Sequence, residues 1–172
     1  MKRLKLRIRM ALVILSVFVT VLGFSLWRSQ YSMGIANSYE IGLPLAQDKI
    51  LIATQSSEFK DSLVRKITEG LKSEPVAIKV IDINGLPNID PDAWSAILVI
   101  HTWENGRPPS QVRHFVDGPV DVRKLVVLTT SSSADKTIVE VDGVSAASQL
   151  HDVPQYTNEV LGRIKNILSR QL

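Results

Sequence analysis

Short apolar runs alternate along most of the chain with segments of helical periodicity. An uninterrupted apolar run bounded by turn residues is typical of a strand that is buried on both faces of a sheet. Apolar residues that recur every three or four positions indicate amphipathic helices. The pattern predicts strands over residues 50–53, 76–81, 96–100, 125–128 and 137–141, and helices over residues 59–71, 110–116 and 153–172.

Alternating strands and helices of this kind predict a parallel sheet with helices on both faces. For five strands the common arrangement is the doubly wound sheet with strand order 2-1-3-4-5. We therefore expect an α/β fold of this type. Ligands bind such sheets outside the carboxyl ends of the strands, so the loops after the first, third and fourth strands are the expected functional loops.

The N-terminal segment differs from the rest of the chain. Residues 10–27 are apolar or uncharged, about the shortest length that spans a hydrocarbon core as a helix. Five basic residues precede this run, at positions 2, 3, 5, 7 and 9. The positive-inside rule then places residues 1–9 in the cytoplasm and the rest of the chain beyond the membrane. In a bacterial cell this predicts a single-pass signal anchor in the inner membrane, with the C-terminal domain on the periplasmic side.

A cleaved signal peptide is the alternative for this segment. Such peptides usually have a shorter apolar region that ends in small residues at the cleavage site, whereas this run ends Gly-Phe-Ser-Leu-Trp. Residues 28–48 follow with two glycines, one proline and no sustained period, which predicts a linker. The folded domain is then expected over residues 49–172.

Composition and charge narrow the function classes. The chain has no cysteine, which excludes disulfides, thiolate nucleophiles and cysteine metal sites. Residues 1–28 hold six of the 20 basic residues and none of the 17 acidic ones, so residues 29–172 have 14 basic and 17 acidic residues, a net charge of −3. The basic character therefore belongs to the N-terminus, and a nucleic-acid-binding surface on the domain is not expected.

The loop after the third predicted strand carries the most specific motif. It contains Thr102-Trp103, then Asn105-Gly106, then two prolines, and a helix with Phe115 follows. This pattern resembles the flavodoxin family, in which an aromatic residue of this loop lies against the flavin ring of FMN. The resemblance implies that Thr102 and Trp103 contact the ring and that Asn105 and Gly106 line its edge. The alternative is that Trp103 simply packs on the domain.

The loop after the first strand is where the family binds the FMN phosphate. The resemblance implies that Ser56, Ser57 and Lys60 hold the phosphate here, at the start of a helix. Two positions depart from the family: Glu58 replaces a glycine and Lys60 replaces a threonine. A carboxylate at this helix end competes with a phosphate. The alternative interpretation is an ordinary helix start, with Ser57 as N-cap and acids in the first turn.

Two further segments bear on a flavin. In the loop after the fourth strand, Ser131 and Ser132 would reach the ring edge, although the aromatic residue found in many flavodoxins is absent there. Residues 142–148 resemble the D-x-x-S/T-G-A-T signature at which FMN is attached covalently in exported flavoproteins, with Ser148 at the acceptor position and Ala146 in place of the glycine. The alternative is packing of small residues at a strand-to-helix junction.

Other chemistry lacks support in the sequence. The three histidines have no zinc-ligand spacing, and neither a nucleophile elbow nor a phosphate-binding P-loop is present.

The sequence leaves two hypotheses for the function. The first is a membrane-tethered flavodoxin-like domain that binds FMN and transfers electrons to a redox partner. The second is the same fold without flavin, serving as an anchored interaction or assembly module.

Overall fold

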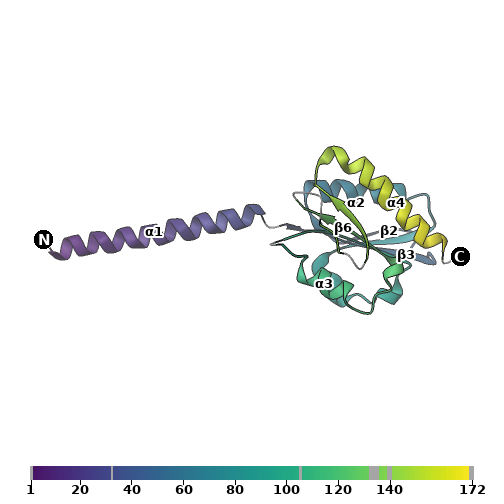
Figure 1. Cartoon of the computed structure of the whole chain (residues 1–172), viewed down its shortest axis with the longest axis horizontal. Coiled ribbons are helices and arrows are strands. Elements are labelled where there is room, and N and C mark those ends of the chain that lie inside the picture. The colour runs from purple at the N-terminus through teal and green to yellow at the C-terminus, as the bar shows by residue number, and fades with distance from the viewer. Residues whose placement is uncertain (1, 32, 105, 132–135, 139–140, 171–172) are drawn as a thin grey trace. The chain divides into compact units, whose positions relative to one another are not determined.

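The computed structural model describes the chain except residues 1, 32, 105, 132–135, 139–140 and 171–172. It divides the chain into two compact units, Met1–Met33 and Gly34–Leu172. The first unit consists of the helix α1 (Lys2–Tyr31), and the second contains the sheet and the remaining helices (Figure 1).

Helix α1 is 30 residues long. Its large apolar side chains between Met10 and Phe24 are exposed. No helix within the described residues combines the length and the apolar character that crossing a membrane requires. The structure therefore does not support the predicted membrane-spanning segment over residues 10–27.

Five parallel strands form the centre of the second unit, in the predicted order 2-1-3-4-5. The sheet runs β4-β3-β5-β6-β7, and its register pairs Ile52 of β3 with Val80 of β4 and Leu98 of β5. This order confirms the doubly wound α/β architecture. The strands are β3 (Asp48–Ser56), β4 (Val76–Asp82), β5 (Ala96–Thr102), β6 (Leu125–Thr130) and β7 (Asp142–Ala146).

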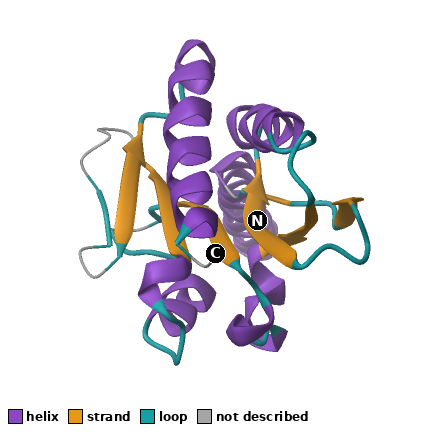
Figure 2. Cartoon of the chain, turned by 90° about the vertical axis from the view of Figure 1, so that its right-hand side faces the viewer, coloured by secondary structure: helices purple, strands orange, loops and turns teal. Residues whose placement is uncertain are grey.

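Helices cover both faces of this sheet (Figures 1 and 2). Successive strand residues point to opposite faces, so Ile52 packs in the core beneath α2 (Glu58–Gly70) and α4 (Val153–Ser169), whereas Leu51 packs in the core beneath α3 (Ser110–Val116). Both faces of each central strand are buried, which explains the uninterrupted apolar runs in the sequence. Short 3-10 helices complete the unit at Ile83–Asn88, Pro91–Ala93, Val122–Lys124 and Leu150–Asp152.

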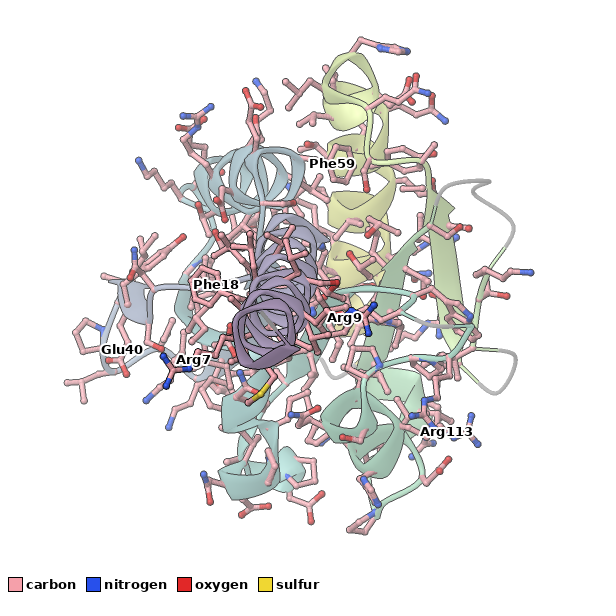
Figure 3. All side chains as sticks on the ribbon, turned by 90° about the vertical axis from the view of Figure 1, so that its left-hand side faces the viewer. Arg7, Arg9, Phe18, Glu40, Phe59 and Arg113 are labelled. Atoms are coloured by element: carbon pink, nitrogen blue, oxygen red, sulfur yellow. The ribbon has the colours of Figure 1, made fainter. Side chains whose placement is uncertain are left out.

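Helix α2 begins with a well-formed N-cap. The Ser57 side chain accepts a hydrogen bond from the Lys60 backbone N–H, and Glu58 and Asp61 lie in the first turn, where carboxylates stabilise a helix. Phe59 is buried on the side of α2 that faces α4 (Figure 3). Its ring meets that of Tyr156 edge-on at a centroid distance of 6.2 Å. The alternative interpretation of this loop as an ordinary helix start is confirmed as far as the cap is concerned.

Two antiparallel strands precede the parallel core, so the sheet has seven strands rather than the five predicted. Strand β1 (Gly34–Ile35) pairs with the end of β3, and β2 (Tyr39–Gly42) pairs with β4 along the outer edge of the sheet. Residues 34–42, here called the strap, are therefore part of the fold and not of a linker. Both strands are too short and too exposed to produce a periodic pattern in the sequence.

The last strand also differs from the prediction over residues 137–141. Strand β7 spans Asp142–Ala146 instead, and residues 139–140 lie outside the described part. Ile138 is apolar because it is buried beside β7, where the Ser145 hydroxyl donates to the Lys136 carbonyl at 3.0 Å. Residues 142–148 are thus mainly strand, and Val144 and Ala146 pack in the core, which favours the packing interpretation of this segment.

Candidate functional site

A polar cluster lies at the carboxyl ends of β3, β5 and β6, the edge at which doubly wound sheets bind ligands. Its side chains come from three strands, from the start of α2 and from the loop after β5. Most of them are buried, so each polar group needs a partner within the protein. The members are Gln55, Lys60, His101, Thr102, Glu104, Thr129 and Thr130.

Lys60 connects α2 to the sheet. Its side chain is only 1% exposed, and Nζ donates to Thr102 Oγ1 at 2.6 Å. Burial lowers the pKa of Lys60 to about 8, although the negative charges of Glu104 and Asp61 oppose this shift. The ammonium group predicted to hold a phosphate is therefore directed into the sheet, toward Thr102.

The hydroxyls beyond Lys60 form a directed chain of hydrogen bonds. Thr130 Oγ1 donates to the His101 carbonyl at 3.3 Å, so the 2.8 Å contact between Thr102 Oγ1 and Thr130 Oγ1 has Thr102 as its donor. Lys60, Thr102, Thr130 and the His101 carbonyl are thus linked in one direction. In a buried environment such a chain strengthens each of its bonds.

Gln55 joins the end of β3 to the loop after β5. Its Oε1 accepts from the Thr102 backbone N–H at 2.7 Å, and its Nε2 donates to Glu104 Oε1 at 2.8 Å. Glu104 and Arg107 pair through both backbone groups and close a tight turn. Gly106 in this turn has φ +77°, a conformation that favours glycine. Gly106 therefore has a structural reason to be a glycine, and Asn105 lies outside the described residues.

His101 is fully buried and serves the fold. Its Nδ1 lies 3.2 Å from the Thr102 carbonyl, which only accepts, so Nδ1 carries the proton and Nε2 accepts from Thr129 Oγ1 at 3.1 Å. Burial lowers the pKa of His101 to about 4. The hydrogen bond to the Thr102 carbonyl opposes this decrease, and the nearby positive charge of Lys60 lowers the pKa further. His101 is neutral at pH 7. Within the described ranges, no three histidine or carboxylate side chains are placed to hold a metal ion.

Trp103 lies half-buried against the domain. Its backbone N–H donates to the Thr130 carbonyl at 2.8 Å, which extends the β5–β6 pairing by one residue. The ring packs on the core beneath α3 and lies 6.4 Å from the His101 ring, tilted by 33°. These contacts favour the packing interpretation of Trp103, although the residue remains partly exposed.

The loop between β3 and α2 consists of Ser57 alone. The Ser56 hydroxyl donates to Asp61 Oδ2 at 2.9 Å, and the Ser57 hydroxyl accepts from the Lys60 N–H at 3.3 Å. Strand β1 pairs directly with Ser56 and covers one side of this turn. Both hydroxyls and the Lys60 ammonium are therefore used within the protein. The residues of this turn do not fit the phosphate group of FMN.

Ser131 follows β6 at the same edge of the sheet. Its N–H donates to the Ala146 carbonyl at 3.0 Å, and its buried hydroxyl has no hydrogen-bond partner among the described residues. Ser132 lies outside the described residues. Of the nine residues predicted to bind FMN, the structure brings Lys60 and Thr102 into direct contact. It bonds Ser57 to the Lys60 backbone N–H and Ser56 to Asp61.

Sequence reasoning missed five members of the polar cluster: Gln55, His101, Glu104, Thr129 and Thr130. A usable signal was present, because Gln55, His101 and Thr129 come directly after, or one residue beyond, an apolar run. Polar side chains at the carboxyl ends of adjacent parallel strands lie at one edge of the sheet. The position of each strand end in the sequence therefore indicated which polar residues meet.

Comparisons with known proteins identify no family. No protein-family model matches the sequence, and no curated protein matches it. Among solved structures, an oxidoreductase from Corynebacterium diphtheriae is 9% identical to this chain, with a TM-score of 0.47. The match covers 72% of this chain and 98% of the oxidoreductase chain. Flavodoxin 2 from Bacillus cereus is 18% identical with a TM-score of 0.47, covering 69% of this chain and 99% of its own. A flavodiiron core from Synechocystis sp. PCC6803 is 8% identical with a TM-score of 0.46, covering 74% of this chain and 37% of its own.

The strand order characterises the fold, because 2-1-3-4-5 with helices on both faces is the flavodoxin-like arrangement. The second unit, Gly34–Leu172, is accordingly a flavodoxin-like domain with an added antiparallel strap.

Proposed function

We propose that the domain works without flavin, as a binding module with a flavodoxin-like fold. One observation carries this proposal: the polar side chains at the turn between β3 and α2 that would hold a phosphate are bonded within the domain. Ser57 caps α2, Ser56 donates to Asp61, and Lys60 is bound to Thr102. A phosphate at this helix end would have to displace these bonds and would meet Glu58 and Asp61 in the first turn.

FMN binding with electron transfer is the second candidate function, favoured by the position of Trp103. This ring lies at the carboxyl end of β5 beside the tight turn that contains Gly106, and it is partly exposed. A flat aromatic face at this edge suits a flavin ring. Without a phosphate site, however, stacking alone would supply only about 1–3 kcal/mol, which corresponds to a weak complex.

A titration of the full chain with FMN separates the two functions. The chain, purified in a non-ionic detergent, is expected to carry no visible flavin absorption and to show no saturable quenching of tryptophan fluorescence by FMN. Riboflavin, which lacks the phosphate, is the matched ligand, and Trp103→Phe is the matched variant. Saturable quenching by FMN that is weaker with riboflavin and absent in Trp103→Phe would establish flavin binding and overturn the first proposal.

Tethering to a membrane is the second part of the proposal. Two observations support it: the basic residues that precede position 10, and the exposed apolar side chains of α1 between Met10 and Phe24. We propose an inner-membrane protein whose domain lies on the periplasmic side, with a protein or small-molecule ligand there and no nucleic-acid partner.

Reporter fusions test the tether and its orientation. A reporter that is active only outside the cytoplasm, fused after Leu172, is expected to be active and to remain in the membrane fraction. Replacing the basic residues at positions 2, 3, 5, 7 and 9 by glutamine is expected to reduce its activity. An active reporter in the soluble fraction, on a shortened chain, would instead establish a cleaved signal peptide.

A further inference from the structure

A small cleft lies between the strap and α2, next to the turn that contains Ser57. It encloses about 220 Å³ and is hereafter called the strap cleft. The strap supplies one wall through Ala36 and Tyr39, the end of β3 supplies Thr54 and Ser56, and α2 supplies Asp61 and Val64. The strap has no counterpart in the predicted five-stranded sheet, so the cleft exists only because residues 34–42 pair with β3 and β4.

The strap is fixed in position by a buried anchor. The Ala36 N–H donates to Asp82 Oδ2 at 2.7 Å, and the other oxygen of Asp82 accepts from the backbone and side-chain nitrogens of Asn84. Ladder pairing places Tyr39 opposite Val80, so the Tyr39 side chain lies on the same face of the sheet as α2. The aromatic ring is thereby held on the wall opposite Asp61.

Asp61 gives the cleft its charge. One carboxylate oxygen accepts from the Ser56 hydroxyl at 2.9 Å, and no ion pair between described residues includes Asp61. The ammonium of Lys60, on the same helix, is bound to Thr102 inside the domain. Burial and the charge of Asp61 both raise the pKa of Tyr39, in keeping with a neutral phenol close to this carboxylate.

These groups define the ligand chemistry. The cleft is lined by a carboxylate that already accepts one hydroxyl hydrogen bond, by an aromatic ring and by the apolar side chains of Val64 and Val80. Such a lining suits a compact organic cation. An anion would meet the carboxylate of Asp61. The volume is below the range of about 300–1,000 Å³ that holds drug-sized ligands, so the occupant is small.

We propose that the strap cleft binds a small alkylammonium ion, with Asp61 as its charge partner and Tyr39 as its aromatic contact. Two sources share this chemistry: a primary ammonium group, as on an amine or a lysine side chain, and a quaternary ammonium group, as on choline. The site is independent of flavin binding and adds a ligand class to the proposed binding module.

Amide NMR spectra of the isotope-labelled full chain in non-ionic detergent test this site. Propylammonium and tetramethylammonium chloride are titrated separately, with 1-propanol and sodium chloride as matched neutral and salt controls. At least one of the two cations is expected to shift the amide signals of Ala36, Asn37 and Ser56 saturably, and the stronger of the two identifies the source. Equal shifts with 1-propanol or sodium chloride, or no saturable shift with either cation, would overturn the proposal.

Variants locate the binding energy. Asp61→Asn keeps an acceptor for Ser56 and is expected to weaken cation binding about tenfold, the worth of a charge-assisted contact. Glu58→Gln removes the same charge from the same helix turn but from a residue that does not line the cleft, and it is expected to change the affinity less than about twofold. Equal losses in both variants would show a diffuse charge effect and overturn the site.

The role of the ring is tested separately. Tyr39→Phe retains the aromatic face and is expected to bind as the original chain does, whereas Tyr39→Leu is expected to bind about fivefold more weakly. Circular dichroism spectra that match the original chain show that both variants fold. Unchanged binding in a folded Tyr39→Leu variant would remove Tyr39 from the site and contradict the proposal.

Discussion

The Nζ atom of Lys60 lies 2.6 Å from Thr102 Oγ1, so a helix and the third strand of the parallel core are joined by a buried ammonium–hydroxyl hydrogen bond. Thr102 in turn donates to Thr130 on the neighbouring strand. A charge in this position stabilises the hydrogen-bonded chain but loses much of its hydration. Stability near the pKa of Lys60 is therefore the most direct measure of what this contact contributes.

The first prediction concerns alkaline pH. Lys60 has a pKa of about 8 in the folded chain and about 10.5 when unfolded, so between these values the unfolded chain binds a proton that the folded chain has lost. Stability from this group is therefore expected to rise with pH across that window, by on the order of 3 kcal/mol. Urea unfolding of the original chain and of Lys60→Met measures it: the variant lacks the rise and equals or exceeds the original stability at pH 7.

Lys66→Met serves as the matched control for this prediction. Lys66 lies on the same helix but is exposed, so its replacement is expected to leave the alkaline rise intact. Each variant replaces one lysine of the same helix by methionine, so the difference between Lys60→Met and Lys66→Met isolates the contribution of Lys60. An alkaline rise that persists unchanged in Lys60→Met would contradict the burial of this ammonium.

A second prediction concerns acid. Burial holds the pKa of His101 at about 4, below its unfolded value of 6.5, so the unfolded chain binds more protons between these values and stability falls as pH drops through them. The loss is expected to be on the order of 2–3 kcal/mol by pH 4. His101→Gln removes this titration. The variant is expected to be less stable at pH 7, and its stability is expected to change less between pH 6.5 and pH 4, here called the acid limb. The exposed His114 gives the control, since His114→Gln leaves the limb unchanged.

The fold was largely predictable because each parallel strand leaves a short apolar run in the sequence, and this pattern recurs along the chain. Central strands that are buried on both faces are apolar throughout, as residues 96–100 are. Helices between such strands indicate parallel pairing, for which 2-1-3-4-5 is a common strand order. The strap was not predictable in this way. Its pairing depends on Ala36 reaching Asp82, a contact between residues 46 positions apart that leaves no periodic trace.

The position of the site in the fold was predictable from the sequence, but the hydrogen bonds between its side chains were not. The loops after β3, β5 and β6 do meet at one edge, as the strand order requires. The sequence does not reveal that Lys60 turns inward to Thr102, because a lysine in the first turn of a helix ordinarily extends into solvent. The resemblance to flavodoxins likewise supplied candidate ligands without showing that Ser56 and Ser57 are bound within the protein.

A third prediction tests the centre of the sheet. Val99 on β5 is 0% exposed, and Val99→Asp is expected to unfold the domain because an unpaired carboxylate in this position costs several kcal/mol. Val122, which is 45% exposed in a 3-10 helix, provides the same substitution at a solvated position, and Val122→Asp is expected to retain the native circular dichroism spectrum. A native spectrum for both variants would be incompatible with β5 as a central strand.

The last prediction concerns the anchor of the strap, and two aspartates make it specific. Asp82 and Asp90 each cap a 3-10 helix by accepting a backbone N–H two residues later, but only Asp82 also accepts from the Ala36 N–H of the strap. Asp82→Ala is expected to lower stability by about 1.5–3 kcal/mol, because its buried donors lose a charged acceptor. Asp90→Ala removes an exposed cap alone and is expected to lower stability by about 0.5–1 kcal/mol.

Hydrogen exchange distinguishes loss of an anchor from a general loss of stability. In Asp82→Ala the amides of residues 35–42 are expected to exchange faster while the amides of β3 keep their original rates, because the strap opens locally. If the strap and β3 accelerate together, or if Asp90→Ala has the same effect on the strap, then β2 pairing alone holds residues 34–42 in place and Asp82 is only a helix cap.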